Sequence, residues 1–188
     1  MVTKFYKWLL FISSYAPLYL LLAINNYNFE ESITVNIRKS FEDKPQFIFW
    51  LVIIVLFLIS LLTVLVLKKW SLNEKMVLGK LSNFNENILS YIITYVVPLT
   101  VININDVNSM VVNLVLFLII GYIYVNNDLI YLNVLLLIVG FRVYSDESGN
   151  KIITDLEKNE LTEKVNEGVL VKYREIARGV YLIRKKQT

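Results

Sequence analysis

The side chains that carry most enzyme chemistry are absent from this sequence, because its 188 residues include no cysteine and no histidine. This composition excludes disulfides, thiol nucleophiles, Cys/His zinc sites and histidine-based triads. No Gly-rich phosphate loop and no metal-ligand spacing is present either. The sequence therefore predicts no catalytic residue, no cofactor and no metal site, and we expect a protein that is not an enzyme.

Polar residues inside the apolar segments have two interpretations. They could line a hydrated pore, or they could hydrogen-bond between helices, which is the usual role of small polar side chains in a bilayer and is favoured here. They are Ser13, Ser14, Ser60, Thr63, Ser90, Thr94, Thr100, Asn103 and Asn113. Asp106 and Asp128 flank an apolar segment, and each is predicted to mark a tight turn.

The C-terminal segment supplies the remaining candidate surface. Its basic and acidic residues nearly balance, and the net charge of the chain is only +3, so direct binding to nucleic acid is not expected. A mixed, solvated surface is the simplest interpretation, followed by protein docking and then by nucleotide binding. The candidate partner-binding residues are Lys172, Tyr173, Arg174, Arg178, Arg184, Lys185 and Lys186.

The segment 47–67 determines the environment of these residues. It contains no charged residue, proline or glycine, and as a helix it would be about 30 Å long, which matches the hydrocarbon core of a bilayer. Lys68, Lys69 and Trp70 follow directly, as cationic and aromatic residues do at a membrane surface. The sequence therefore predicts a membrane span here.

Three other apolar segments have the length of spans, about 8–25, 88–104 and 109–125. The first could also be a signal peptide, but it is too long and no small-residue cleavage site follows it. Pro17 predicts a kink within it. A fifth apolar segment, 129–141, is too short to cross and is predicted to be re-entrant or interfacial.

The polar connections carry weaker signals. In the loop 26–46, Ile33, Val35 and Ile37 alternate with polar residues, which suggests a short strand, a small external sensor patch or simply a solvated loop. The segment 68–87 has apolar residues at helical spacing and is interpreted as a short amphipathic segment on the membrane surface.

Residues 142–188 change character and form the second predicted domain. Two strands around a Gly-containing turn, a polar helix ending at Gly168, and two more strands around Gly179 are expected. The predicted fold is thus mainly α, with a four-helix transmembrane domain over 1–141 and a small α+β cytoplasmic tail.

The distribution of basic residues predicts the topology. Lysines precede the first span and follow the second, and the tail ends in a basic cluster, so the positive-inside rule places all three in the cytoplasm. That requires an even number of crossings. The expected location is therefore the inner membrane, with four spans and with both termini cytoplasmic.

Two stretches resemble a known family. The segment SSYAPLY at 13–19 and the segment LIVGFRVY at 137–144 are similar to KwaA, the membrane subunits of the Kiwa anti-phage defence systems. The resemblance implies a homo-oligomer, for which we expect a tetramer, that senses infection at the inner membrane. It also implies a cytoplasmic DNA-binding partner resembling KwaB, and it transfers no catalytic residue.

Two functional hypotheses follow. The first is a non-enzymatic membrane sensor or scaffold whose cytoplasmic face recruits a soluble effector. The alternative is a pore-forming or membrane-disrupting effector that is triggered through its tail. Depolarisation of cells on expression of the chain alone would distinguish the second from the first.

Overall fold

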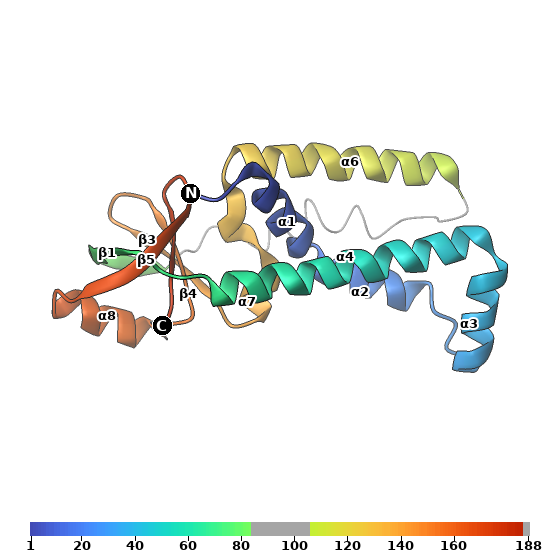
Figure 1. Ribbon diagram of the computed structural model, residues 1–188, viewed down its shortest axis with the longest axis horizontal. Helices are drawn as coiled ribbons and strands as arrows, with labels where there is room; N and C mark the ends of the chain where they lie inside the picture. The colour runs from blue at the N-terminus through green and yellow to red at the C-terminus, as the bar shows by residue number, and fades with distance from the viewer. Residues whose placement is uncertain (84–105, 186–188) are drawn as a thin grey trace.

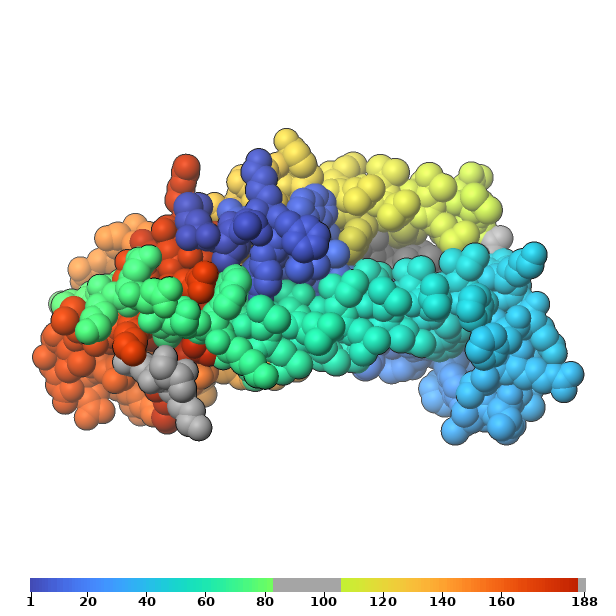
Figure 2. Space-filling model, in the orientation of Figure 1, coloured from blue at the N-terminus to red at the C-terminus, as the bar shows by residue number. Residues whose placement is uncertain are grey.

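The computed structural model describes residues 1–83 and 106–185, and it is elongated, with long helices towards one end and a sheet at the other (Figure 1). Two helices, α4 (Lys44–Lys69) and α6 (Val107–Asn126), are long and apolar enough to cross a membrane. Many of their large apolar side chains are exposed, and α4 lies along the surface of the molecule (Figure 2). An exposed apolar surface of this extent is typical of a membrane-embedded protein.

A bent pair of shorter helices precedes α4. Helices α1 (Lys4–Ser14) and α2 (Ala16–Asn25) differ in direction by 41° and could together form a third span. Pro17 lies in the first turn of α2, so the predicted kink is confirmed. The Tyr19 hydroxyl donates to the Ile12 carbonyl at 3.0 Å, which satisfies one acceptor beside the break.

The structure confirms the apolar spans only in part. Helices α4 and α6 contain the predicted segments 47–67 and 109–125. Residues 129–141 form the short helices η3 (Leu129–Leu132) and α7 (Val134–Ile138), neither of which could cross a bilayer. The predicted span at 88–104 lies outside the described residues.

The connection before α4 differs from the prediction. Residues expected to form a short strand or a loop form the helix α3 (Ile33–Glu42), which lies across the start of α4 (Figure 1). Its apolar residues Ile33, Ile37 and Phe41 are four apart, and this helical spacing prevails over the alternation near residue 35. None of its side chains is buried, so α3 presents an apolar stripe on the surface.

Six strands form one sheet in the order β1-β5-β6-β4-β3-β2. Neighbouring strands are antiparallel except β4 and β6, which are parallel. The four strands predicted in the tail are confirmed as β3 (Arg142–Asp146), β4 (Lys151–Thr154), β5 (Leu170–Ala177) and β6 (Val180–Ile183). The predicted polar helix is α8 (Lys158–Asn166), which begins with a capping box between Glu157 and Glu160.

The two edge strands come from the segment after α4. Strands β1 (Glu74–Val77) and β2 (Leu81–Asn83) replace the amphipathic surface segment that the sequence had suggested. Only three residues separate them, which span at most about 14 Å, yet they occupy opposite edges of the sheet. The sheet must therefore curl until its edges approach each other, with Leu78 of the connection buried.

The curled sheet has two apolar faces because side chains alternate along its strands. Ile153, Leu182 and Ile176 belong to the core that includes the apolar helices. Their neighbours Ile152 and Ile183 pack in a second core that includes Leu161 of α8. The tail sheet is thus packed directly against the helices by one face and covered by α8 on the other.

Close packing of α6 on α1 depends on Gly121. A Cβ at this position would lie 2.6 Å from Phe11 Cε1 and 2.7 Å from Trp8 Cη2, which is too close for real contacts. We therefore expect Gly121→Ala to destabilise the protein by about 1–3 kcal/mol, measured as a lower melting temperature in detergent.

Two controls separate crowding from backbone effects. Gly79→Ala meets no atom within 4 Å and should leave the melting temperature unchanged. Adding Trp8→Leu to Gly121→Ala should restore part of the loss. A higher melting temperature for Gly121→Ala alone would mean that helix propensity outweighs packing and would contradict this interpretation.

Candidate functional site

The end of α4 meets the sheet, and Arg184 joins the two. This residue follows β6, is only 7% exposed, and donates from Nη1 to the Lys68 carbonyl and from Nη2 to the Trp70 carbonyl. The Lys68 carbonyl is among the last four of α4, which lack partners inside the helix. The guanidinium therefore satisfies the helix terminus and places a positive charge at the negative end of its dipole.

An aromatic and cationic stack surrounds the same junction. The Trp70 ring lies 4.5 Å from the Tyr6 ring of α1, centroid to centroid, and the Arg174 guanidinium lies 4.5 Å from the Trp70 centroid. Arg174 also donates to the Ser71 carbonyl at 3.4 Å, and the Tyr6 hydroxyl donates to the Thr63 carbonyl at 2.8 Å. These contacts hold together three segments that are distant in sequence: α1, the end of α4 and β5.

Two further contacts complete the junction. The Val2 amide donates to the Ile176 carbonyl of β5 at 3.1 Å, which attaches the N-terminus to the sheet. The Lys68 ammonium lies 5.9 Å from the centroid of the Phe141 ring, just before β3. The N-terminus, the end of α4 and the sheet therefore form one connected unit.

The seven candidate partner-binding residues divide between this junction and the surface. Arg184 is buried and Arg174 stacks on Trp70, so both have structural contacts that the sequence interpretation missed. Lys185 is exposed but pairs with Glu160, and its amide donates to Asp155 at 2.7 Å. Lys186 lies outside the described residues.

The other three candidates lie on β5 and in the turn that follows it. Tyr173 packs edge-on against Tyr181, with ring centroids 5.3 Å apart, and its hydrogen bond with the Glu74 carboxylate raises the pKa of Tyr173 to about 12. Lys172 is half-buried, and Arg178 is exposed in the β5–β6 turn.

The sheet register adds a cation that the candidate set lacks. Lys75 of β1 lies directly opposite Lys172 of β5, and Lys75 is exposed. Like charges opposite each other are unfavourable, so a negatively charged partner would stabilise this pair. We define Lys75 and Lys172 as the basic edge, and Arg178 lies apart from it at the other end of β5. No ion pair of these three residues occurs within the part of the chain that the structure describes.

A partly buried ion pair was also missed by sequence reasoning. Lys7 of α1 binds Asp128 in the turn after α6, and their side chains are 10% and 20% exposed. Asp128 does mark a turn, as predicted, and it adopts a left-handed conformation with φ of 56°. Nothing in the spacing of these two residues, 121 apart, predicts that they meet.

Small polar side chains of the helices bond both between and within helices. Asn133 donates to the Leu10 carbonyl and to Ser13 Oγ, both at 2.8 Å, and Ser60 donates to the Leu56 carbonyl of its own helix at 2.7 Å and reaches the Ile12 carbonyl at 3.5 Å. The favoured interpretation of such residues as bonds between helices is thus confirmed for Ser13 and Ser60, whereas the bonds of Ser14, Thr63 and Asn113 stay within their own helices. Ser90, Thr94, Thr100 and Asn103 lie outside the described residues.

A comparison with known proteins identifies the family. The family of the anti-phage protein KwaA matches residues 6–182 of this chain, which include the Lys7–Asp128 ion pair and nearly all of the curled sheet, whereas Arg184 of the junction lies just beyond the matched residues. No curated protein and no solved structure matches it. Because the match covers nearly the whole sequence, this chain belongs to the KwaA family of anti-phage proteins.

Proposed function

We propose that this anti-phage protein is a non-enzymatic sensor or scaffold of the inner membrane, and that its cytoplasmic sheet recruits a soluble DNA-binding effector resembling KwaB. The observation that carries the proposal is the junction, where Arg184 bonds to the end of α4. Since the sheet packs on the helices through shared core residues, a displacement of α4 in the membrane would move the sheet. A partner on the sheet could therefore respond to events in the membrane.

The junction also supports the proposed topology. The N-terminus, the end of α4 and the sheet lie together, so residues 2, 70 and 176 would be on one side of the membrane. The bent pair α1–α2 and α4 then account for two crossings. Helix α6 and the predicted span 88–104 would supply the other two, giving four spans with both termini cytoplasmic.

The basic edge is the proposed contact for the effector. Its unpaired cations suit an acidic protein surface, and the effector rather than this chain would touch DNA. Assembly into a homo-oligomer, with a tetramer as the expected state, would repeat the edge around an axis and bind several effector copies. An effector that engages several edges at once would be held more tightly than at a single edge, although each individual contact is unchanged.

Charge reversal tests this surface. We expect Lys75→Glu with Lys172→Glu to reduce co-purification of the effector from detergent by at least about tenfold, since like charges across an interface cost several kcal/mol. Arg38→Glu, an exposed cation on α3 at the other end of the molecule, is the matched control and should change nothing. Equal recovery with both variants would reject the basic edge as the docking surface.

A membrane-potential dye tests the alternative of a pore. Cells that express the chain alone should stay polarised if it is a sensor or scaffold. Depolarisation of cells that express the unchanged chain, and its loss in variants of the tail residues 142–188, would favour a pore-forming effector instead.

A further inference from the structure

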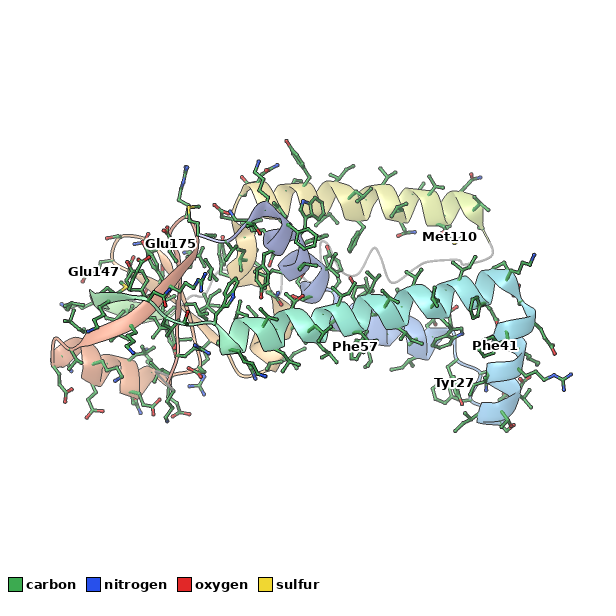
Figure 3. The ribbon with its side chains drawn as sticks, in the orientation of Figure 1. Tyr27, Phe41, Phe57, Met110, Glu147 and Glu175 are labelled. Carbon is green, nitrogen blue, oxygen red and sulfur yellow. The ribbon has the colours of Figure 1, made fainter. Side chains whose placement is uncertain are left out.

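A cavity of about 540 Å³ lies at the end of the molecule opposite the sheet. Its walls come from the turn between α2 and α3, from α3, and from the first turns of α4. Four aromatic side chains line it, Tyr27, Phe41, Phe47 and Trp50, and Figure 3 shows Tyr27 and Phe41 at this end. The rings of Phe41 and Phe47 are 5.3 Å apart between centroids.

Glu31 lines the cavity, and only one of its two carboxylate oxygens has a hydrogen-bond partner among the described residues. Its Oε1 accepts from the Lys39 ammonium, whereas Oε2 is buried and has no hydrogen-bond partner among the residues that the structure describes. A buried acceptor without a partner is unfavourable, and such groups are rare in folded proteins. The position is held by the turn, because Asn36 donates to the Asn28 carbonyl at 2.8 Å and the Glu31 amide donates to the same carbonyl.

A cavity that is lined by both a carboxylate and aromatic rings is suited to an organic cation. Ring faces attract cations, and the carboxylate favours a group that can also donate a hydrogen bond. A primary ammonium has both properties, whereas a quaternary ammonium has no N–H to donate. A bound metal ion does not fit, since no cluster of three candidate ligands occurs in 1–83 or 106–185.

The polarity of the cavity changes along α4. Glu31, Asn36 and Gln46 line its polar side, whereas Leu51 and Ile54 line its other side within the apolar segment that matches a bilayer core. The exposed apolar stripe on α3 is typical of a helix that lies in the membrane interface. A ligand with a polar head and an acyl tail fits this gradient better than a free polar metabolite.

We propose that this cavity binds the headgroup of a phospholipid that carries a primary ammonium, with the ammonium on the Glu31 carboxylate. The cavity is roughly 35 Å along α4 from the junction, at a rise of about 1.5 Å per residue, so the lipid lies in the other leaflet. That leaflet is the outer one if the proposed topology holds. The binding itself depends only on the cavity.

Native mass spectrometry of the full chain, released from detergent with added lipid, tests the proposal. Phosphatidylethanolamine should be retained at least about tenfold more than phosphatidylcholine or phosphatidylglycerol, as a bond to a charged group allows. Glu31→Gln should abolish this preference. Glu42→Gln, which removes an exposed carboxylate at the end of α3 and outside the cavity, should not.

Two further measurements separate the possible outcomes. Lys39→Gln removes the ion pair but leaves the Glu31 carboxylate, so retention of phosphatidylethanolamine should persist. Equal retention of all three lipids, or unchanged preference in Glu31→Gln, would overturn the site, and binding of soluble glycerophosphoethanolamine without the lipid would overturn the lipid assignment. Effector co-purification with Glu31→Gln reports on the proposed function separately.

Discussion

Arg184→Ala is expected to lower the stability of the detergent-solubilised protein by about 3 kcal/mol, which corresponds to a fall in melting temperature of roughly 6–12 °C. The side chain is buried and donates to two backbone carbonyls, one of them at the end of α4. Its removal leaves both acceptors without this partner. The fraction of monodisperse protein that survives heating, measured by size-exclusion chromatography, gives the melting temperature.

Two variants control for charge and for truncation. Arg184→Lys keeps the charge but cannot present the guanidinium fork to both carbonyls, so it should recover only part of the loss. Lys185→Ala removes the adjacent cation, which is exposed and pairs with Glu160, and should leave the melting temperature unchanged. If Arg184→Ala and Lys185→Ala behaved alike, Arg184 would not join α4 to the sheet.

The same variant tests the proposed coupling. Arg184 lies next to Lys172 in the sheet register but is buried and is not a residue of the basic edge, so its loss should leave Lys75 and Lys172 in place if the sheet stays folded. We then expect the effector to bind the protein but infection to produce a weaker defence response. A variant that folds, binds the effector and defends normally would contradict transmission through this junction.

The tail could be predicted from sequence because its signals are local. Gly149 and Gly179 adopt positive φ in turns between strands, and a capping box marks the start of α8. Each signal lies within a few residues of the element that it defines. The strands on either side alternate between two buried faces, which is the pattern that periodicity detects.

Strands β1 and β2 could not be predicted because their partners are remote. Each has four residues or fewer, and Glu74 pairs with Tyr173 while Leu81 pairs with Asp146. Their apolar residues fit a helical period as well as a strand, so tertiary pairing decides the outcome. The basic edge was missed for the same reason, since Lys75 and Lys172 become neighbours only through this register.

Two charged residues near the apolar helices have contacts that sequence reasoning missed in a similar way. Lys7 was assigned to the membrane flank and Arg184 to a binding surface, because single-sequence reasoning treats each cation by its immediate neighbours. In the structure, Lys7 binds Asp128 and Arg184 binds the end of α4. Both contacts lie at the ends of helices that could be membrane spans, where a charge is tolerated only if it is paired.

Breaking the Lys7–Asp128 pair from either side is expected to destabilise the protein by about 2–4 kcal/mol, since each single change leaves one charge buried without its partner. Lys7→Met and Asp128→Asn are the suitable variants. Asparagine tolerates the left-handed conformation at position 128, whereas alanine would add about 1 kcal/mol of backbone strain. Melting temperatures in detergent are the measurement.

The double variant Lys7→Met, Asp128→Asn decides whether the pair acts as a unit. If it does, the double variant should be more stable than either single variant, with a coupling energy of about 1–3 kcal/mol, because no unpaired charge remains. Simple addition of the two losses would mean that the residues act independently. Helix α1 begins and α6 ends near this pair. A coupled pair would therefore hold these two helix ends at the same depth in the membrane, next to the junction through which α4 meets the sheet.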